Sequence, residues 1–236
     1  MTVHADIHLH SCLSPCGDLS MSPRALVEAA VRAGLSLIAL TDHNTARNAP
    51  AFAAACSEAG IVPLFGAEAT SSEEAHVLGI FGDLESGLEF GERLYATLPE
   101  FAVDPARYGD QVVVDPDEMV IEVLAKGLIS ASTYSLRQLG ELIHELGGLF
   151  IPAHIDRSSF SIWSQLGFLP PDSYDAVEIY SNSNRIAYDG YTAICNSDAH
   201  FPADVARRHF SFEADEPSFR GLQHAIADGA IARHGV

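Results

Sequence analysis

The sequence predicts an α/β protein in which a single barrel of parallel strands is surrounded by helices. Short apolar runs of strand length alternate with helical segments along most of the chain, as in repeated strand–helix–strand units. The chain has 236 residues, of which 47% are hydrophobic, and a single barrel of this class commonly has that size. Polar residues follow the carboxyl ends of the apolar runs, where such barrels carry their active sites.

The first predicted strand, Val3 to His10, ends in two histidines. His8 and His10 are two residues apart, so their side chains point to the same side of an extended chain. Two imidazoles held close together suit one metal ion better than they suit a hydrophobic core. A loop rich in Ser, Pro, Gly and Cys follows, and Ser22 and Pro23 then begin a helix as N-cap and first helical residue.

The rest of the chain repeats this alternation. The other predicted strands are Leu35–Leu40, Ile61–Phe65, His76–Phe81, Leu149–Ala153, Ala176–Tyr180, Thr192–Asn196 and about His209–Glu213. The other predicted helices are about Ala49–Ala59, the segment from the capping box at Ser135 to Gly147, and a last segment between Pro217 and Gly229.

Residues from about 83 to 133 interrupt the alternation. This segment mixes charged and apolar residues around three prolines, and it predicts short helices and turns without a clear strand. We interpret it as a mostly helical insertion, which either forms a lid over a site or only packs. The sequence contains no internal repeat or linker, so residues 1–236 are expected to form one domain.

The composition restricts the expected partners. A formal net charge of -19 argues against a broad basic face that binds duplex nucleic acid. It leaves room for a small phosphorylated substrate, because bound divalent metals supply local positive charge. No apolar run approaches the roughly 20 residues that span a bilayer, and no secretory signal is recognisable. The four cysteines do not form a disulfide framework, so we expect a reducing cytoplasm.

The polar residues at the strand ends have the chemistry of metal ligands. In chain order they are His8, His10, Asp42, His43, Glu68, His154, Asn182 to Arg185, Asp198 and His200, with His76 at the start of its strand instead. The carboxyl ends of the strands share one face of a barrel, so these imidazoles and carboxylates are expected to converge. The remaining five histidines are interpreted as structural or solvated: His4, His144, His209, His224 and His234.

These residues resemble the successive motifs of the polymerase-and-histidinol-phosphatase (PHP) family. The matching motifs are His8-Leu-His10-Ser, Thr41-Asp-His43-Asn, Gly66-Ala-Glu68, His76, Pro152-Ala-His154 and Ser197-Asp198-Ala-His200. The resemblance covers nearly the whole chain outside the insertion. It implies a distorted barrel of seven β/α units, a centre of two or three divalent metal ions (Zn, Mn or Fe), and phosphoesterase activity.

The resemblance also implies which residues hold each metal. The implied ligands are His8, His10, Glu68 and Asp198 for the first metal, Glu68, His76 and His154 for the second, and His43, His200 and Asp18 for the third. Asp18 comes from the loop after the first strand, in which Cys12 or Cys16 is the alternative ligand. Asp6 and Asp42 are expected to orient neighbouring ligands, as carboxylates beside metal-bound histidines commonly do.

Phosphoester hydrolysis needs an activated water and positive charge around the phosphoryl group. Arg157, Arg185 and Asn184 are the expected substrate-binding residues, because arginine binds phosphate oxygens through a planar fork of donors. Asp198 or His200 could protonate the leaving oxygen. The expected substrate is a phosphomonoester of a small metabolite, such as a sugar or amino-alcohol phosphate, or of a nucleotide, and the expected catalytic residues are Asp198, His200 and Arg157.

Two other classes of function stay open. One is a metal-dependent hydrolase of C–N bonds, which often uses a carboxylated lysine; the only lysine, Lys126, lies in the predicted insertion. The other is a non-catalytic metal-binding module. A nucleotide substrate would need an aromatic platform, for which Tyr134, Phe160 and Trp163 are candidates.

Overall fold

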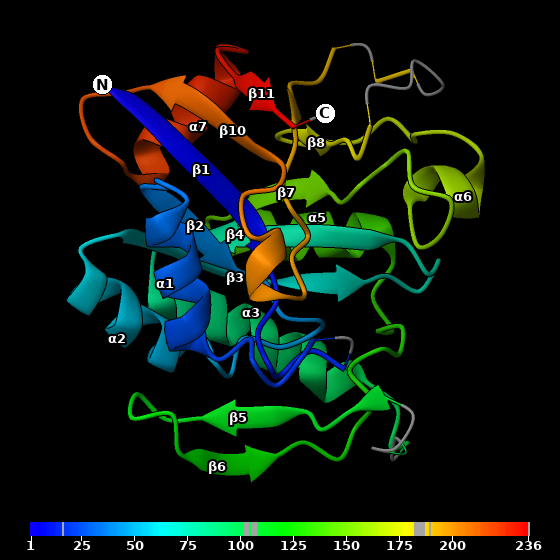
Figure 1. Cartoon of the computed structure of the whole chain (residues 1–236). Coiled ribbons are helices and arrows are strands. Elements are labelled where there is room, and N and C mark those ends of the chain that lie inside the picture. The colour runs from blue at the N-terminus through cyan, green and yellow to red at the C-terminus, as the bar shows by residue number, and fades with distance from the viewer. Residues whose placement is uncertain (16, 102–103, 105–107, 182–186, 189, 236) are drawn as a thin grey trace.

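The computed structural model describes residues 1–15, 17–101, 104, 108–181, 187–188 and 190–235. Its main element is a curled sheet of seven strands in the order β11-β10-β1-β2-β3-β4-β7 (Figure 1). These strands are β1 (Thr2–Leu9), β2 (Leu37–Leu40), β3 (Val62–Thr70), β4 (His76–Phe81), β7 (Leu149–Pro152), β10 (His209–Glu213) and β11 (Ala232–His234). Two smaller sheets pair β5 (Val112–Val114) with β6 (Val120–Val123), and β8 (Val177–Glu178) with β9 (Ala193–Ile194). The predicted distorted α/β barrel is thus confirmed.

Helices cover both faces of the curled sheet. They are α1 (Pro23–Arg32), α2 (Ala49–Ala59), α3 (Leu84–Thr97), α5 (Leu136–Glu145), α6 (Ile162–Leu166) and α7 (Phe219–Ala227), with a short 3-10 helix η1 (Pro202–Asp204). The Ser22 hydroxyl caps α1 by accepting a hydrogen bond from the backbone N–H of Ala25, and Ser135 and Gln138 form the predicted capping box of α5. No helix in the described part of the chain is long and apolar enough to cross a membrane.

The two faces of the sheet pack into separate hydrophobic clusters. The inner cluster joins Val3, Ala5 and Ile7 of β1 to α7, and an outer cluster joins Leu9 to α1 and α2. A second outer cluster packs α3 and α5 against β3, β4 and β7. Each fully buried large apolar side chain contributes about 1.5–3 kcal/mol relative to exposure, so this packing holds the strand ends in place.

The alternation of side chains along β1 is interrupted just before the two histidines. Ile7 packs in the inner cluster, whereas Leu9, two residues later, packs in the outer one. The pairing of β1 with β2 correspondingly shifts register between Asp6 and Leu9, as a β-bulge does. His8 and His10 therefore point to the side opposite α1 and α2, toward the carboxyl ends of the neighbouring strands.

The sheet is mixed, and this explains the position of His76. Strands β1, β2 and β3 are parallel, but β4 is antiparallel to β3, and Thr70 at the end of β3 pairs with His76 at the start of β4. The first residue of β4 thus lies at the same edge as the last residues of the parallel strands. The expectation of parallel strands throughout was wrong. His76 nevertheless lies beside the strand-end residues, as expected, because β4 runs in the opposite direction.

The segment from about 83 to 133 contains the strand pair β5–β6, which the sequence analysis did not predict. Val112 to Val114 form a run of β-branched residues, which favour extended structure. The hairpin packs on the loop after β1, since Val113 contacts the cluster around Leu13. Asn48 fixes it further, because its side chain donates to the carbonyl of Val112 and accepts from the N–H of Val114. The segment thus supports a strand-end loop, in addition to covering the sheet with α3.

Candidate metal centre

The polar residues at the strand ends meet at one edge of the curled sheet. Strand β1 and the residues after β2 contribute His8, His10 and His43, and β3 contributes Glu68. Isolated parallel bridges join Leu9 to Ala199 and His43 to Glu68. These bridges extend the sheet beyond its regular strands and bring segments far apart in the sequence together.

Glu68 lies in the middle of this cluster and is 1% exposed. Its Oε1 atom is 2.8 Å from His76 Nδ1 and 3.0 Å from His154 Nε2. Its Oε2 atom is 2.9 Å from His43 Nδ1. The two carboxylate oxygens thus face different imidazoles, as expected of a carboxylate that bridges two metal ions.

His8 and His10 face the carboxylates through their Nε2 atoms. His8 Nε2 is 3.3 Å from Glu68 Oε1 and 3.5 Å from Asp198 Oδ1, and His10 Nε2 is 3.2 Å from Asp198 Oδ1. Both Nε2 atoms are buried and have no hydrogen-bond partner among the described residues.

The opposite ring nitrogens of both histidines are engaged. His8 Nδ1 is 3.0 Å from Glu178 Oε2, which can only accept. Ser14 donates its hydroxyl proton to Asp42 at 2.7 Å and accepts from His10 Nδ1 at 3.0 Å. In the neutral form of each ring, Nε2 then carries a lone pair that faces carboxylate lone pairs, and these repel each other unless a cation or a proton lies between them. The donors present therefore fit a divalent metal ion.

Three groups of ligand atoms at this edge each lie within 4.8 Å of one another, counted over the described residues. They are His8, His10 and Asp198; His43, Glu68 and His76; and His10, His43 and His200. Together with His154 beside Glu68, they include every predicted metal ligand except Asp18. His10 belongs to both the first and the third group, and its one free ring nitrogen can bind only one ion, so the assignment of Asp18 to the third metal stays a prediction.

Asp18 is not among these groups, although its backbone N–H donates to the carbonyl oxygen of His200 at 3.3 Å. Its side chain is exposed, and its Oδ1 accepts a hydrogen bond of 2.8 Å from the N–H of Ser20. Hydrogen bonds from Ser20 lower the pKa of this carboxyl. The cysteine alternative does not replace it, because the thiol of Cys12 is buried against Ala51 and Val112, and burial raises its pKa to about 12. Cys16, Asn184 and Arg185 lie outside the described residues.

The negative charges of the centre govern the protonation of His8. Burial opposes charge on this imidazole, but Glu178, Glu68 and Asp198 outweigh burial and hold the pKa of His8 well above its ordinary value. Burial likewise opposes charge on Asp198, but His8 and His10 hold the pKa of Asp198 below its ordinary value. The site favours a positive charge at the Nε2 atom of His8, whether that charge is a proton or a metal.

Burial keeps two of the other imidazoles, His10 and His76, in the neutral form. Burial, His200 and His43 hold the pKa of His10 well below its ordinary value. Burial lowers the pKa of His76 to about 4, although Glu68 opposes this shift. Neutral imidazoles are the form that binds metals, so these residues need not lose a proton to act as ligands at neutral pH.

Glu178, which the sequence analysis missed, contacts two of the predicted metal ligands. It is buried at the end of β8 and accepts hydrogen bonds from His8 Nδ1, from the backbone N–H of His154 at 2.7 Å, and from the Asn196 side chain at 2.8 Å. It thereby orients two predicted ligands at once. A single carboxylate within the apolar run Ala176–Tyr180 was the signal available in the sequence, because an acidic residue is rarely buried without a partner.

Arg157 closes one side of the centre. Its Nη1 donates to Asp198 Oδ2 at 2.8 Å, which leaves Asp198 Oδ1 facing His8 and His10. The Arg157 side chain is 38% exposed, so it borders both the centre and solvent. His154 and Asp198 have positive φ angles of 29° and 53°. Such backbone strain is uncommon outside glycine and concentrates at functional sites.

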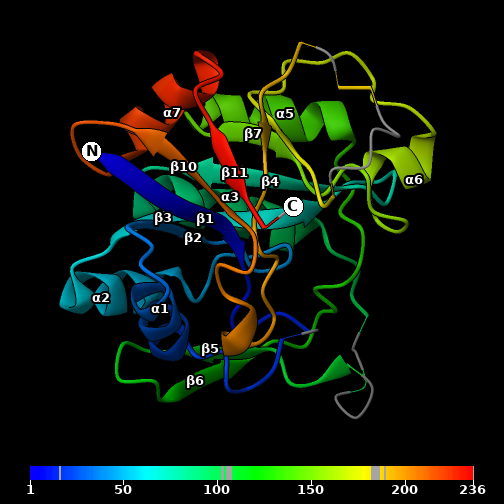
Figure 2. The same ribbon diagram turned by 45° about the horizontal axis from the view of Figure 1, so that its top comes forward.

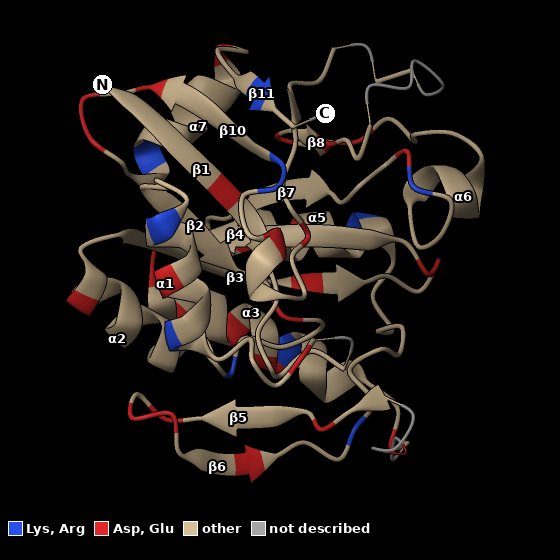
Figure 3. Cartoon of the chain, viewed as in Figure 1, with Lys and Arg blue, Asp and Glu red and all other residues tan. Residues whose placement is uncertain are grey.

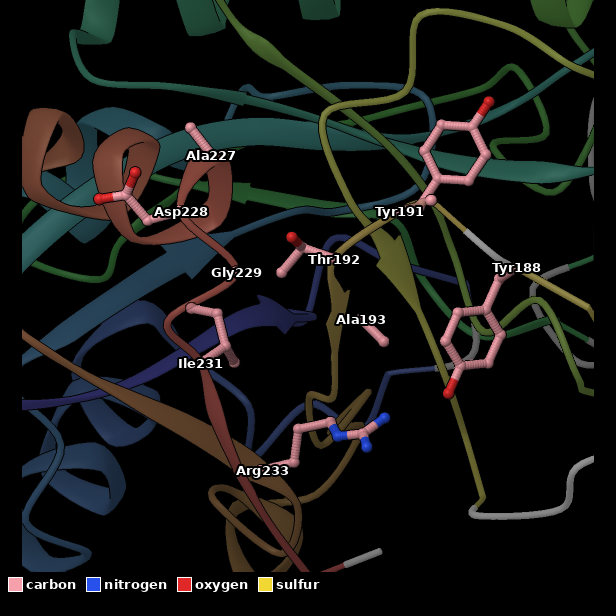
Figure 4. A pocket seen from close by; sticks show the side chains of 10 residues that line it. Tyr188, Tyr191, Thr192, Ala193, Ala227, Asp228, Gly229, Ile231 and Arg233 are labelled. Carbon is pink, nitrogen blue, oxygen red and sulfur yellow. The ribbon is translucent and has the colours of Figure 1, made fainter.

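A pocket of about 500 Å³ lies elsewhere, between the segment before β9 and the turn after α7 (Figure 4). Tyr188, Thr192, Asp228 and Arg233 are among the residues that line it. None of them belongs to the ligand groups described above, so this pocket is separate from the metal centre.

The curled α/β barrel and its buried imidazoles and carboxylates define an α/β-barrel protein with a candidate metal centre. The chain belongs to the PHP domain family, whose model matches residues 6–183. Among curated proteins, error-prone DNA polymerases from Nocardia farcinica and Mycobacterium tuberculosis are 48% and 43% identical over 65 residues. That stretch is 28% of this chain and 6% of either polymerase.

Solved structures show the same fold at low identity. The lesion-specific endonuclease PfuEndoQ from Pyrococcus furiosus superposes with a TM-score of 0.72 at 20% identity, over 99% of this chain and 57% of that one. A candidate metal-dependent phosphoesterase from Bifidobacterium adolescentis superposes with a TM-score of 0.57 at 18% identity, over 97% and 96% of the two chains. The chain thus spans little more than half of the endonuclease and a small part of the polymerases.

The expectation that net charge excludes duplex nucleic acid was wrong. A structure of Endonuclease Q in complex with a 27-mer duplex substrate, with an abasic lesion at the active site, shares this fold with a TM-score of 0.68 over 99% of this chain. Acidic and basic positions are scattered over the elements of the chain in Figure 3. A net charge summed over the whole chain therefore does not describe the surface around one site, where a bound metal ion would add positive charge.

Proposed function

We propose that this protein is a metal-dependent phosphoesterase that cleaves phosphate esters of nucleic acids, with DNA that carries a damaged nucleotide as the first substrate to test. The facing lone pairs of His8, His10, Glu68 and Asp198 carry the proposal, because they need cations between them. Divalent metals held there act as Lewis acids on phosphoryl oxygens and lower the pKa of water.

The residues of the chain have distinct roles in this proposal. Glu68 holds the two halves of the centre together, since its oxygens face His76 and His154 on one side and His43 on the other. Glu178 fixes the tautomer of His8. Arg157 binds a phosphate oxygen with the guanidinium N–H groups that do not contact Asp198, because guanidinium has five donors.

Aromatic residues beside the centre support a nucleic-acid substrate. The ring of Phe160 stacks on His76, with 5.0 Å between centroids and an interplanar angle of 16°. Phe160 and Trp163 are 38% and 40% exposed. Base stacking on an exposed aromatic ring contributes about 1–3 kcal/mol per base, so these rings offer a platform for an unstacked base. The likeness in fold to a lesion-specific endonuclease supports the same substrate class.

A second candidate is a phosphomonoester of a small metabolite or nucleotide. The candidate phosphoesterase from Bifidobacterium adolescentis superposes over nearly the full length of both chains, which supports this substrate class. The same centre and Arg157 would bind the phosphate of such a compound. The two candidate functions differ in the size of the substrate, so an assay on a series of substrates can decide between them.

The test is a cleavage assay on a duplex oligonucleotide with one abasic site and on the intact duplex, with p-nitrophenyl phosphate and nucleoside monophosphates in parallel. The protein is loaded with Mn²⁺ or Zn²⁺, and the metal content is verified. We expect strand cleavage at the lesion, which Glu68→Gln abolishes and the surface variant Glu141→Gln retains. Release of phosphate only from the small compounds would favour the second candidate. No product from any substrate, with metal bound, would contradict both and favour a non-catalytic module.

A C–N hydrolase with a carboxylated lysine lacks support. Lys126 forms an ion pair with Glu100 at 2.9 Å and contacts the carbonyl groups of Tyr95 and Leu98. These residues lie in the segment around α3 and take no part in the ligand groups.

A further inference from the structure

A second cluster of histidines lies outside the metal centre. His4, His209 and His234 come from the adjacent strands β1, β10 and β11, and one ring nitrogen of each lies within 4.8 Å of those of the other two. All three side chains are partly buried. Figure 2 shows β11 beside β10, at the margin of the sheet.

Strand register places the three imidazoles on one face. His209 pairs directly with His234, and His4 pairs with Ser211. Residues two apart on a strand share a face, so His209 lies on the face of Ser211 and therefore of His4. The ring centroids are 4.7 Å apart for His209 and His234, 5.5 Å for His4 and His209, and 5.7 Å for His4 and His234.

This cluster is distinct from the metal centre. His4 precedes His8 by about 13 Å along an extended strand. Val3 and Ala5, on either side of His4, pack in the inner cluster with α7, so the side chain of His4 points to the opposite face. No residue of the centre belongs to this second group.

Hydrogen bonds orient two of the rings. His209 Nδ1 donates to the carbonyl oxygen of Ala206 at 3.1 Å, which leaves its Nε2 as a lone-pair donor. His234 Nε2 lies 2.8 Å from the hydroxyl of Ser211, and in the tautomer in which this nitrogen donates, Nδ1 carries the lone pair. Ligating histidines are commonly held by their second ring nitrogen in this manner.

Neighbouring cationic side chains point away from the cluster. Arg208 donates to the carbonyl groups of Asn196 and Ser197. Arg233 precedes His234 on β11 and points toward Tyr188 in the separate pocket (Figure 4). The guanidinium groups of Arg208 and Arg233 therefore do not lie between the three imidazoles.

We propose that His4, His209 and His234 bind a divalent transition-metal ion of the zinc class, with water in the remaining position, and that this ion ties the edge strand β11 to β10 and β1. Imidazole suits Zn²⁺, Cu²⁺ and Ni²⁺. Tetrahedral Zn–N bonds of about 2.0–2.1 Å place ligand nitrogens roughly 3.4 Å apart. Small rotations of these partly exposed side chains reach that spacing from separations within 4.8 Å.

The test compares the number of Zn²⁺ ions bound by the wild type and by variants of the full chain. Each protein is stripped of metal with a chelator and dialysed to equilibrium against Zn²⁺, and its metal content is then measured by elemental analysis. We expect His209→Gln and His234→Asn each to bind one equivalent fewer than the wild type, with unchanged circular dichroism. His224→Ala, which removes an exposed histidine of α7, is the matched control and retains the wild-type stoichiometry. Having two variants on different strands keeps the test valid if one of them fails to fold.

A second measurement is the thermal shift. At a free Zn²⁺ concentration about a hundredfold above the dissociation constant, one bound ion raises the melting temperature of a chain of this size by roughly 5–10 °C. We expect that part of the shift to disappear in both variants and to persist in the control. Unchanged stoichiometry and thermal shift in both variants would overturn the proposal, as would an equal loss in His224→Ala.

Discussion

Replacing Glu178 with Gln tests whether the buried carboxylate behind His8 serves the metal centre. The carboxylate accepts from three donors: His8 Nδ1, the N–H of His154, and the Asn196 side chain. A glutamine presents one oxygen and one NH₂ group in the same space. At least one of the three donors then faces another donor, and the charge opposite His8 is lost.

The loss can be estimated from these contacts. A hydrogen bond that involves a charged group contributes about 1.5–3 kcal/mol, which corresponds to a roughly 10- to 150-fold change in an equilibrium constant. Carboxylates behind metal-bound histidines typically alter metal affinity by about 10- to 100-fold when mutated. We therefore expect Glu178→Gln to raise the dissociation constant of the ion at His8 by one to two orders of magnitude.

The sign of the pH dependence sharpens this expectation. Glu178 raises the pKa of His8, so it favours a proton on this ring as well as a metal. At low pH the proton competes with the metal for His8 more strongly in the wild type than in the variant. This competition partly cancels the gain in metal affinity that Glu178 provides. The deficit of the variant should therefore grow as pH rises from 6 to 8.

The assay is competition of the protein with a chromogenic Zn²⁺ chelator at both pH values, with melting curves as a check on folding. Glu141→Gln, which alters an exposed ion pair with Arg137, is the matched control. A Glu178→Gln protein that is folded and binds metal within twofold of the wild type at pH 8 would refute the assignment of Glu178 as the residue that orients His8.

Two further predictions concern Arg157 and Asp6. Arg157→Ala should lower kcat/KM for any phosphoester substrate by about 10- to 100-fold, because a charged hydrogen bond is lost. Arg157→Lys should lower it by less, and both variants should melt near the wild-type temperature. Equal kcat/KM in the wild type and both variants would argue against phosphate binding by this residue. Burial raises the pKa of Asp6 to about 6 in the folded chain; the folded state therefore holds the proton more tightly than the unfolded one, and stability falls as pH rises from about 4 to 6. As pH rises from 4 to 7, the free energy of unfolding of metal-stripped Asp6→Asn should therefore increase relative to that of the metal-stripped wild type by up to about 3 kcal/mol. The same pH dependence of unfolding in both proteins, measured by chemical denaturation, would contradict this.

Local patterns in the sequence predicted the α/β barrel and most of the residues that lie together at the candidate centre. Apolar runs followed by His or Asp mark strand ends, and strand ends of an α/β barrel converge whatever the loops do. His76 could be grouped with them only through the family resemblance. Its geometric reason, the reversal of β4, depends on which strands pair, and pairing is a long-range property that strand patterns do not encode.

Other features depended on contacts that no local pattern contains. Asp18 sits in the loop after β1, which packs against the β5–β6 hairpin, and its carboxylate accepts a hydrogen bond from Ser20. The cluster of His4, His209 and His234 joins residues more than two hundred positions apart in the chain. His209 and His234 approach each other only because β10 and β11 are antiparallel in that register.

Part of the acidity of the chain lies in its candidate metal centre. Glu68, Glu178 and Asp42 are fully or almost fully buried, and the pKa of Glu68 is held well below its ordinary value by His76, His8 and His43, against the effect of burial. Buried carboxylates are costly unless cations or donors compensate them. Each divalent ion bound beside Glu68 adds two positive charges where a phosphate would approach. The formal charge of the chain counts the carboxylates and omits these ions, so it overstates the repulsion that a phosphate experiences at this edge of the sheet.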